Sequence, residues 1–331
     1  MCTLRRVLYN ALVEAAVLLP GLQNARATFG NGSDMENRIV CTVIGDAMID
    51  IIIPLSGLED IRNLTEGGVA NTEMMVSPGG AANVAVHIAD LGGNSAFVGK
   101  VGDDYFGRVF IEGLEGKNVV CRAPTASKRT GVVVSLVLAG GERFFIVDRG
   151  ANAELSFDDI DMDLILSSDA IYLTGYSFQD EKTSQTIRRI LELVPERVTV
   201  VFNPGAPRLA EELRLDFLDL IEKHAGAVVL NKREGEYLTE CTKESEMVNH
   251  LLGLTRVVAL TKGHEGSTVA TRNEIHGFVA LDMPVTDTTG AGDAYAAGLI
   301  YGLSKGLGVA GAGKLATKLA AEVVSRFGAR I

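Results

Sequence analysis

The stretch Asp287-Thr-Thr-Gly-Ala-Gly-Asp293 runs directly into Ala294-Tyr-Ala-Ala-Gly-Leu-Ile300, so a polar loop passes into an apolar helix at its glycines. Small residues let the amides at a helix start approach a ligand closely. Such amides can stabilise a phosphoryl group during transfer. Asp293 falls in the first helical turn, where the helix dipole favours an ionised carboxylate. The pattern indicates a base for an alcohol proton, the alternative being that Asp293 only caps the helix.

Upstream of this motif, buried strands alternate with helices. Predicted strands cover 170–174, 198–203, 227–231 and 257–261, and helical patterns such as 182–194 and 209–224 lie between them. This alternation is typical of a parallel sheet covered by helices on both faces. Two regions, about 50–76 and 129–148, have the pattern of hairpins instead, and we predict that they form a small β lid on the large α/β lobe.

The N-terminal residues differ from the rest of the chain. Residues 1–34 contain an apolar stretch behind two arginines, which has the form of a weak secretory signal, but Asn10 and Glu14 interrupt it. We interpret 1–34 as a leader or as an extension from a mis-set start codon, followed by one domain over 35–331. Its first strand is expected from Arg38 to Ile44, extended by Asp50-Ile-Ile-Ile-Pro54.

Composition excludes several classes of protein. The net charge is −11 from 31 basic and 42 acidic residues, and no run of Lys or Arg is longer than two, which argues against nucleic acid as a partner. The 4 cysteines and 5 histidines are scattered without the spacing of a zinc site. No stretch is a convincing membrane helix. We therefore expect a cytoplasmic protein that acts on a small molecule.

A second glycine pattern is misleading. Gly306-Leu-Gly308-Val-Ala-Gly311 reads as a dinucleotide-binding GxGxxG, but it follows a helical pattern instead of a strand. The overlapping stretch 308–314 imitates a Walker A loop, yet Leu315 stands where a magnesium-binding Ser or Thr is required. A turn between two helices is the better interpretation of both.

Two motifs together connect the chain with a known family. With Gly79-Gly80-Ala-Ala-Asn83-Val-Ala near its start and Asp287-Thr-Thr-Gly-Ala-Gly-Asp293 near its end, the sequence resembles the ribokinase-like (PfkB) family of carbohydrate and nucleoside kinases over about 36–331. The resemblance implies an α/β fold with a central, mostly parallel sheet flanked by helices and a small β-sheet lid. It also implies ATP and Mg²⁺ as cofactors and, in some members, K⁺.

The same resemblance assigns roles to residues. It makes Asp293 the catalytic base and the amides of Gly290, Ala291 and Gly292 an anion hole. The positions that match substrate-binding residues are Asp50, Gly79, Gly80, Asn83, Arg149 and Asn152. For Arg149 two interpretations stay open, a contact to an acidic or phosphorylated substrate and a solvated edge residue.

Further positions match the family's nucleotide and metal sites. The nucleotide-binding set is Asn203, Asn231, Glu234, Thr261, Gly263 and Gly266. Glu234 would position Mg²⁺ through water. Asp287 and Thr289 match positions that help bind a monovalent cation, with carbonyls near Val323, Arg326 and Gly328, although a ligand that some relatives supply further downstream is missing.

The predicted function is ATP-dependent phosphorylation of a primary hydroxyl of a small sugar of the ribose or hexose type. Asn203 and the stretch Arg149-Gly-Ala-Asn152 favour such sugars. One alternative is a nucleoside kinase, with Phe106, Phe144 or Phe145 stacking on a base. Another is a non-catalytic sugar-binding protein on the same fold. Lid strands in this family often pair between subunits, so we expect a homodimer formed through the lid.

Overall fold

The computed structural model describes residues 39–55, 57, 72–138 and 143–330. The chain divides into two units, Met1–Glu36 and Asn37–Ile331, and the description concerns the second. The predicted leader over 1–34 and most of the loop of the first lid region lie outside the described residues.

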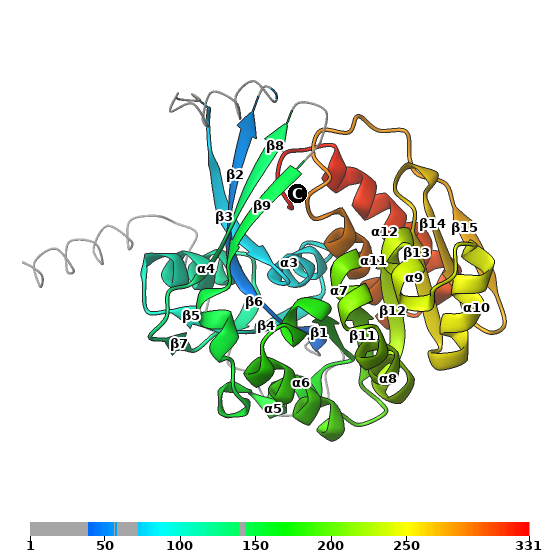
Figure 1. Ribbon diagram of the computed structural model, residues 1–331, viewed down its shortest axis with the longest axis horizontal. Coiled ribbons are helices and arrows are strands. Elements are labelled where there is room, and N and C mark those ends of the chain that lie inside the picture. Colours follow the sequence, from blue (N-terminus) through cyan, green and yellow to red (C-terminus); the bar gives the residue numbers. More distant parts are fainter. Residues whose placement is uncertain (1–38, 56, 58–71, 139–142, 331) are drawn as a thin grey trace, which may run out of the picture. The chain divides into compact units, whose positions relative to one another are not determined.

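The large sheet has nine strands within the described residues (Figure 1). Its spatial order is β15 (Ile275–Phe278), β14 (Ser267–Ala270), β13 (Val257–Thr261), β12 (Ala225–Asn231), β11 (Thr199–Asn203), β10 (Ala170–Thr174), β1 (Ile39–Ile44), β4 (Asn94–Val98) and β6 (Val119–Arg122). All pairs from β13 to β6 are parallel, and only the edge strands β14 and β15 join antiparallel. The predicted mostly parallel sheet is confirmed.

A separate sheet of four strands is also present. It has the order β3 (Met75–Gly80), β2 (Ala47–Leu55), β8 (Gly131–Leu138) and β9 (Arg143–Asp148). The strands β8 and β9 form the expected antiparallel hairpin. A short parallel pair, β5 (Val101–Gly102) and β7 (Thr125–Ala126), completes the sheets of the described residues.

The expectation that Asp50–Pro54 extends the first strand was wrong. The chain leaves the large sheet after Ile44, turns at Gly45 and Asp46, and enters the small sheet as β2. A Cβ on Gly45 would lie 2.8 Å from the Cβ of Ala81, so the turn packs too closely for a larger residue. Both strands are apolar, and the hydrophobic pattern alone therefore could not separate them.

Helices cover both faces of the large sheet. One face carries α3 (Ala82–Asp90), α4 (Tyr105–Glu115), α11 (Ala291–Ser304) and α12 (Gly308–Val324). The other carries α5 (Met162–Ser167), α6 (Glu181–Leu193), α7 (Pro207–Glu212), α8 (Arg214–His224), α9 (Lys232–Thr239) and α10 (Glu244–Leu254). Short 3₁₀ turns connect some of the described elements: η1 (Gly150–Glu154), η2 (Phe157–Asp159), η3 (Gly175–Phe178) and η4 (Gly263–Glu265).

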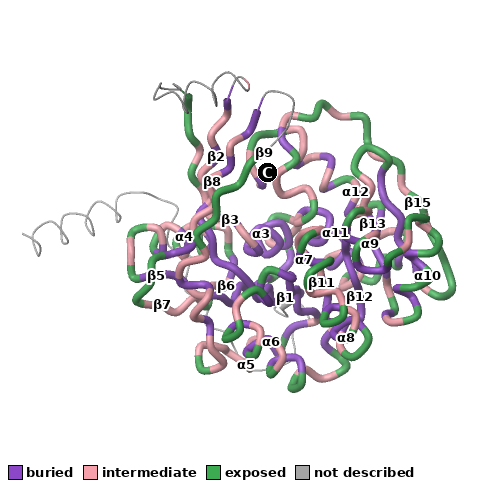
Figure 2. The backbone as a smooth tube through the Cα atoms, viewed as in Figure 1, coloured by how far each residue is buried: buried purple, intermediate pink, exposed green. Residues whose placement is uncertain are grey.

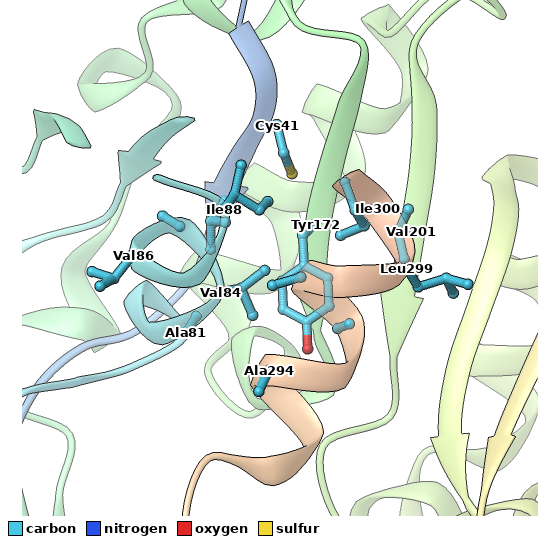
Figure 3. Packing of buried hydrophobic residues seen from close by; sticks show 14 of the residues in the cluster. Cys41, Ala81, Val84, Val86, Ile88, Tyr172, Val201, Ala294, Leu299 and Ile300 are labelled. Atoms are coloured by element: carbon cyan, nitrogen blue, oxygen red, sulfur yellow. The ribbon is translucent and has the colours of Figure 1, made fainter. Parts of the chain in front are cut away.

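The central strands of the large sheet are buried on both sides, as the purple trace in Figure 2 shows. Alternate residues of a strand pack into the hydrophobic cores on the two faces of the sheet, because successive side chains point to opposite faces. In β10, Ile171 and Leu173 pack with the α6 and α8 face, while Tyr172 packs with Leu299 and Ile300 of α11 (Figure 3). This double burial explains the nearly continuous apolar sequence of these strands.

Two smaller expectations concern the helices. The pattern over 209–224 forms two helices that meet at Leu213, not one. The GxGxxG stretch lies at the turn from α11 to α12, with Gly306 and Gly308 at φ of 71° and 67°, as the sequence indicated. Among the described helices, none combines the length and apolar character needed to cross a membrane.

Candidate active site

A cavity of about 690 Å³ lies where the carboxyl ends of the central strands meet the small sheet. The large sheet contributes Thr174, Asn203, Asn231 and Thr261, the last residues of β10, β11, β12 and β13. The small sheet contributes Met48, Asp50, Val133, Phe145 and Val147. Open α/β sheets bind ligands at this end of their strands, so the cavity is the candidate site.

A second cavity of about 630 Å³ adjoins the first, and Thr261 and Gly292 line both. Its walls are largely apolar and include Leu281, Met283, Val285, Ala320 and Val324. His264 and Tyr295 add flat polar side chains. The start of α11 therefore stands between two chambers of similar volume.

Two glycines at the start of α11, Gly290 and Gly292, differ in the space around them. Gly290 has a φ of 76°, and a Cβ there would lie 2.6 Å from Ala329, so the protein itself requires glycine. At Gly292 an added Cβ would meet no atom within 4 Å. Open space beside Gly292 leaves room for a ligand to reach the amides of Gly290, Ala291 and Gly292, the predicted anion hole.

Asp293 lies in the first turn of α11 and lines the first cavity. The side-chain amide of Asn83, on α3, donates to its Oδ2 at 3.2 Å. Loss of water contact raises the pKa of Asp293 to about 6, against the opposing effects of Asn83 and of the positive charge of Arg330. Asp293 is thus still mainly ionised at neutral pH and retains Oδ1 for a second partner.

Asp50 occupies the same cavity from the middle of β2. Burial raises its pKa to about 7, with Arg330 lowering it and the negative Asp293 raising it further. A Cβ on Gly79 would lie 1.9 Å from Asp50 Oδ2. Gly79 does not line the cavity, and its contribution is the space that the Asp50 carboxylate occupies.

Arg149 lines the cavity but is held by the protein. Its guanidinium donates two hydrogen bonds to Asp46, at 2.8 and 3.1 Å, and one to Asp180 at 2.7 Å. A further bond reaches Gln179 Oε1 at 2.7 Å. With 18% of its side chain exposed, Arg149 is an ion-paired residue of the cavity wall and not a solvated edge residue.

Asn152 is buried away from the cavity. Its Oδ1 accepts from the amide of Ala47 at 2.7 Å, and its Nδ2 donates to the Ala47 carbonyl at 3.0 Å. A third bond joins Nδ2 to the Arg149 carbonyl at 2.9 Å. These contacts tie the start of β2 to the segment after β9.

Glu234 begins α9 in a capping box with Asn231. Its Oε2 accepts from the Asn231 amide at 2.9 Å, and Asn231 Oδ1 accepts from the Glu234 amide at 3.0 Å. Both residues line the first cavity, and burial raises the pKa of Glu234 to about 7.

Asp287 lies behind the anion-hole turn and is buried. Its Oδ1 accepts from the amide and hydroxyl of Thr289, at 2.8 and 2.6 Å, and its Oδ2 accepts from the Gly328 amide at 3.1 Å. Thr289 itself reaches the first cavity. Asp287 therefore joins this turn to the C-terminal segment.

The structure thus brings most of the predicted residues together around the two cavities. Those lining the first are Asp50, Gly80, Asn83, Arg149, Asn203, Asn231, Glu234, Thr261, Thr289, Gly290, Gly292 and Asp293. Those lining the second are Thr261, Gly263, Gly266, Ala291 and Gly292. Gly79, Asn152 and Asp287 line neither cavity.

Sequence reasoning missed four residues. Asp46 and Tyr176 line the first cavity, as does Tyr172, whose hydroxyl points toward the start of α11 beside Ala294 (Figure 3). Arg330 donates from Nε to Asn83 Oδ1 at 3.0 Å. A tyrosine inside an apolar strand was an available signal for Tyr172, but nothing local distinguishes Arg330.

The comparisons with known proteins agree with this architecture. Residues 39–331 match the model of the pfkB family of carbohydrate kinases. An uncharacterized sugar kinase of Archaeoglobus fulgidus is 30% identical over 247 residues, which cover 73% of this chain and 96% of that protein.

Two solved structures extend the agreement to three dimensions. An adenosine kinase from Sinorhizobium meliloti is 26% identical, with a TM-score of 0.81 over 88% of this chain and 95% of that one. A fructokinase from Vibrio cholerae, solved with fructose, ADP and calcium ion, is 26% identical, with a TM-score of 0.74 over 87% and 94% of the two chains. The predicted ribokinase-like fold is confirmed, and the chain belongs to the pfkB family of carbohydrate kinases.

Proposed function

We propose that this protein is an ATP-dependent kinase that phosphorylates a primary hydroxyl of a small, uncharged sugar of the ribose or hexose type. The observation that carries the proposal is the start of α11, where Asp293 lines the first cavity and Gly292 lines both. Transfer between two chambers requires a base on the acceptor side and hydrogen-bond donors at the boundary.

In this mechanism the acceptor sugar binds in the first cavity. Asp50 accepts hydrogen bonds from its hydroxyls, because an ionised carboxylate accepts several. Asp293 takes the proton of the attacking hydroxyl at Oδ1, while Asn83 holds Oδ2. The amides of Gly290, Ala291 and Gly292 face the phosphoryl oxygens. Bound MgATP supplies the phosphoryl group and the charge of its metal.

The second cavity has the features that a nucleotide requires. Its apolar walls suit a base, and Gly263 and Gly266 have left-handed φ values of 60° and 92°, which let backbone follow a ligand closely. Glu234 is a buried carboxylate at the first cavity with a raised pKa, and a nearby cation would favour its ionised form. Glu234 would hold Mg²⁺ through water, since Mg²⁺ keeps several waters.

The charges around the first cavity favour an uncharged acceptor. Four carboxylates line it, those of Asp46, Asp50, Glu234 and Asp293. Among the described residues of its lining, Arg149 is the single cation, and its N–H groups already bond Asp46, Asp180 and Gln179. A phosphorylated or acidic sugar would meet carboxylates without a free cation.

A nucleoside kinase is the second candidate, and one observation supports it. Phe145 and Val147 of β9 and the ring of Tyr176 line the first cavity. Together they offer apolar surface on which a base could stack. The similarity to an adenosine kinase is consistent with this alternative.

A monovalent cation site at Asp287 and Thr289 remains part of the proposal. The Thr286 amide donates to the Val324 carbonyl at 2.8 Å, so the two segments that would form the site lie together. Turnover should rise when K⁺ replaces a large organic cation at constant ionic strength, and equal rates in both would remove this site.

We also propose a homodimer formed through the small sheet. The face of this sheet opposite Asp50 carries half-buried Ile53, Val134 and Leu136 and exposed Phe144 and Ile146. The strand β9 is exposed from Phe144 to Asp148 and forms the edge of the sheet (Figure 2). An apolar sheet face with a free edge is suited to a second copy of the chain.

The deciding experiment measures ADP formation from MgATP with pentoses, hexoses, sugar acids, sugar phosphates and nucleosides. We expect turnover with an uncharged sugar, and a loss in kcat of about 10²–10⁴-fold in Asp293→Asn with nearly unchanged ATP affinity. Turnover with nucleosides alone would select the second candidate. Binding of ATP and sugar without turnover would indicate a non-catalytic sugar-binding protein.

A further inference from the structure

We propose that Arg330 is a positioning residue of the phosphoryl-transfer site, which fixes the Asn83 amide against Asp293 and balances the negative charge of Asp293 and Asp50. The inference rests on the proposed kinase reaction, in which Asp293 is the base. Arg330 does not line either cavity, so it acts through its neighbours and not by touching the acceptor.

The C-terminal segment is held in place before it reaches Arg330. The Gly328 amide donates to Asp287 Oδ2 at 3.1 Å, and Ala329 packs against Gly290. The carbonyl of Ala329 can only accept, so Nε2 of the buried His87 donates to it at 2.9 Å. In Figure 1 this red end of the chain lies between α3 and the small sheet. The hydrogen bonds and packing of Gly328 and Ala329 therefore fix the position of Arg330.

Arg330 donates a hydrogen bond to Asn83, and Asn83 donates one to Asp293, the proposed base. A guanidinium only donates, and Arg330 Nε lies 3.0 Å from Asn83 Oδ1. The amide of Asn83 consequently turns its NH₂ toward Asp293 Oδ2, at 3.2 Å. Without Arg330, a rotated amide would present its oxygen to a carboxylate, which is repulsive. Arg330 thus selects the orientation in which Asn83 supports Asp293.

Charge gives a second, independent argument. Asp293 interacts electrostatically with Asp50 on β2, Tyr172 on β10 and Tyr176 in η3. Arg330 interacts with Asp50 and with His87 and Asp90 on α3. Around them, Lys117 after α4 acts on His87, and Glu234 on α9 acts on the two tyrosines. Burial lowers the pKa of His87, which keeps it neutral. Arg330 is the cation that opposes the raised pKa of both Asp293 and Asp50.

The state of Arg330 itself is consistent with this role. Burial lowers its pKa to about 10, so it stays charged at neutral pH. Its Nη2 is buried and has no hydrogen-bond partner among the described residues. A buried N–H group without a partner is costly, so Arg330 is placed there at the expense of stability.

The test compares pH profiles of kcat/KM for wild type, Arg330→Met, Arg330→Lys and Arg108→Met, a change at an exposed arginine of α4 that lines neither cavity. In Arg330→Met the acidic limb should move up by about one pH unit, which from a pKa of about 6 is about a fivefold additional loss at pH 6 relative to pH 9. In Arg330→Lys the acidic limb should lie close to its wild-type pH, because lysine keeps the positive charge. Arg108→Met should match wild type.

A second measurement separates this inference from the proposed function. Carbon-13 NMR of labelled aspartates follows the titration of Asp293 and Asp50 without substrate, with Asp293→Asn and Asp50→Asn to assign the signals. In Arg330→Met, or in Arg330→Gln if the methionine variant does not fold, both titrations should move to higher pH. This readout holds even if no acceptor is turned over, in which case only the proposed function fails.

Two outcomes would overturn the role of Arg330. One is a uniform loss of activity at every pH in Arg330→Met with unchanged aspartate titrations, which would indicate packing of the C-terminal segment alone. The other is a wild-type pH profile and wild-type titrations in both Arg330→Met and Arg330→Gln.

Discussion

At Asp293, the proposed role of base conflicts with the stability of the fold. Its pKa rises from 3.8 to about 6 on folding, so the folded protein holds the proton more tightly than the unfolded chain. Above pH 6 the ionised carboxylate therefore costs folding free energy, and below about pH 4 that cost is absent. The start of α11 keeps a charged group where a neutral one would be more stable.

The first prediction follows from the destabilising effect of the ionised Asp293 carboxylate. Asp293→Asn should raise the free energy of unfolding at pH 8 by up to about 3 kcal/mol, because a tenfold change in proton affinity on folding corresponds to about 1.36 kcal/mol. The gain should shrink as the pH falls through about 6 and disappear near pH 4. Urea unfolding at pH 8 and at pH 4.5 measures it.

Asp103→Asn is the matched control, because Asp103 is exposed and lines neither cavity. It should change stability little at either pH. A destabilised Asp293→Asn at pH 8 would mean that the charge of Asp293 is stabilised by its surroundings and not penalised.

Gly79 provides the second prediction at the residue scale. The Cβ in Gly79→Ala would overlap the Asp50 carboxylate, at 1.9 Å, and must displace it. Gly79→Ala should therefore behave like Asp50→Asn. The KM for the acceptor should rise about tenfold or more, because a hydrogen bond to a charged group is lost. The KM for ATP should stay unchanged.

Steady-state kinetics with both substrates varied makes this measurement. Gly277→Ala is the control, since a Cβ at Gly277 in β15 meets no atom within 4 Å. A Gly79→Ala enzyme with wild-type KM for the acceptor would show that Asp50 does not bind it.

At the scale of elements, an ion-pair network links the small sheet to the large lobe. Asp46 lies in the turn from β1 to β2, Arg149 follows β9, and Asp180 precedes α6. Burial raises the pKa of Asp46 and Arg149 opposes this effect. The network therefore holds the start of β2 and the end of β9, which lie at the same end of the small sheet, against the start of α6.

The third prediction removes this network. Arg149→Met should lower the free energy of unfolding by about 3 kcal/mol, because it leaves Asp46 buried without its cation. Adding Asp46→Asn to the same chain should recover part of the loss, since no buried charge then remains. Guanidinium unfolding of the two variants and of Asp46→Asn alone completes the double-mutant cycle. Additive losses in the cycle would contradict direct pairing.

At the scale of the whole molecule, the two faces of the small sheet have different surroundings. Asp50, Val133, Phe145 and Val147 face the first cavity. Phe144 and Ile146 lie on the opposite face of the same strand and are 47% and 64% exposed. An exposed apolar face on a sheet with a free edge favours association.

The fourth prediction tests that association. Wild type should sediment as a dimer at micromolar concentration, and Ile146→Glu should sediment as a monomer because it places a charge in the proposed interface. Ile275→Glu is the control, as Ile275 is 63% exposed on β15, at the far edge of the large sheet. A monomeric wild type would exclude the dimer, and a dimeric Ile146→Glu would place its interface elsewhere.

Much of this protein is determined locally by its sequence. The strand bounds of β10 and β13, the helix start at Gly290 and Asp293, and the hairpin of β8 and β9 all follow from residue patterns within a few positions. Burial of a strand on both faces demands a continuous apolar run, and a helix start requires small residues where a ligand approaches. Local interactions are enough to determine such features.

Other features depend on which distant segments meet. Arg330 and Asn83 are 247 positions apart, and Arg149 and Asp46 are 103 apart, so no neighbouring residue signals either contact. The sequence also did not reveal that the chain passes from the large sheet to the small sheet at Gly45, because strands in both sheets bury similar apolar side chains. The sequence by itself determined the strands, the helices and the glycine-rich helix start, while only the tertiary structure decided the partners of the charged residues, since charge pairing depends on packing between remote elements.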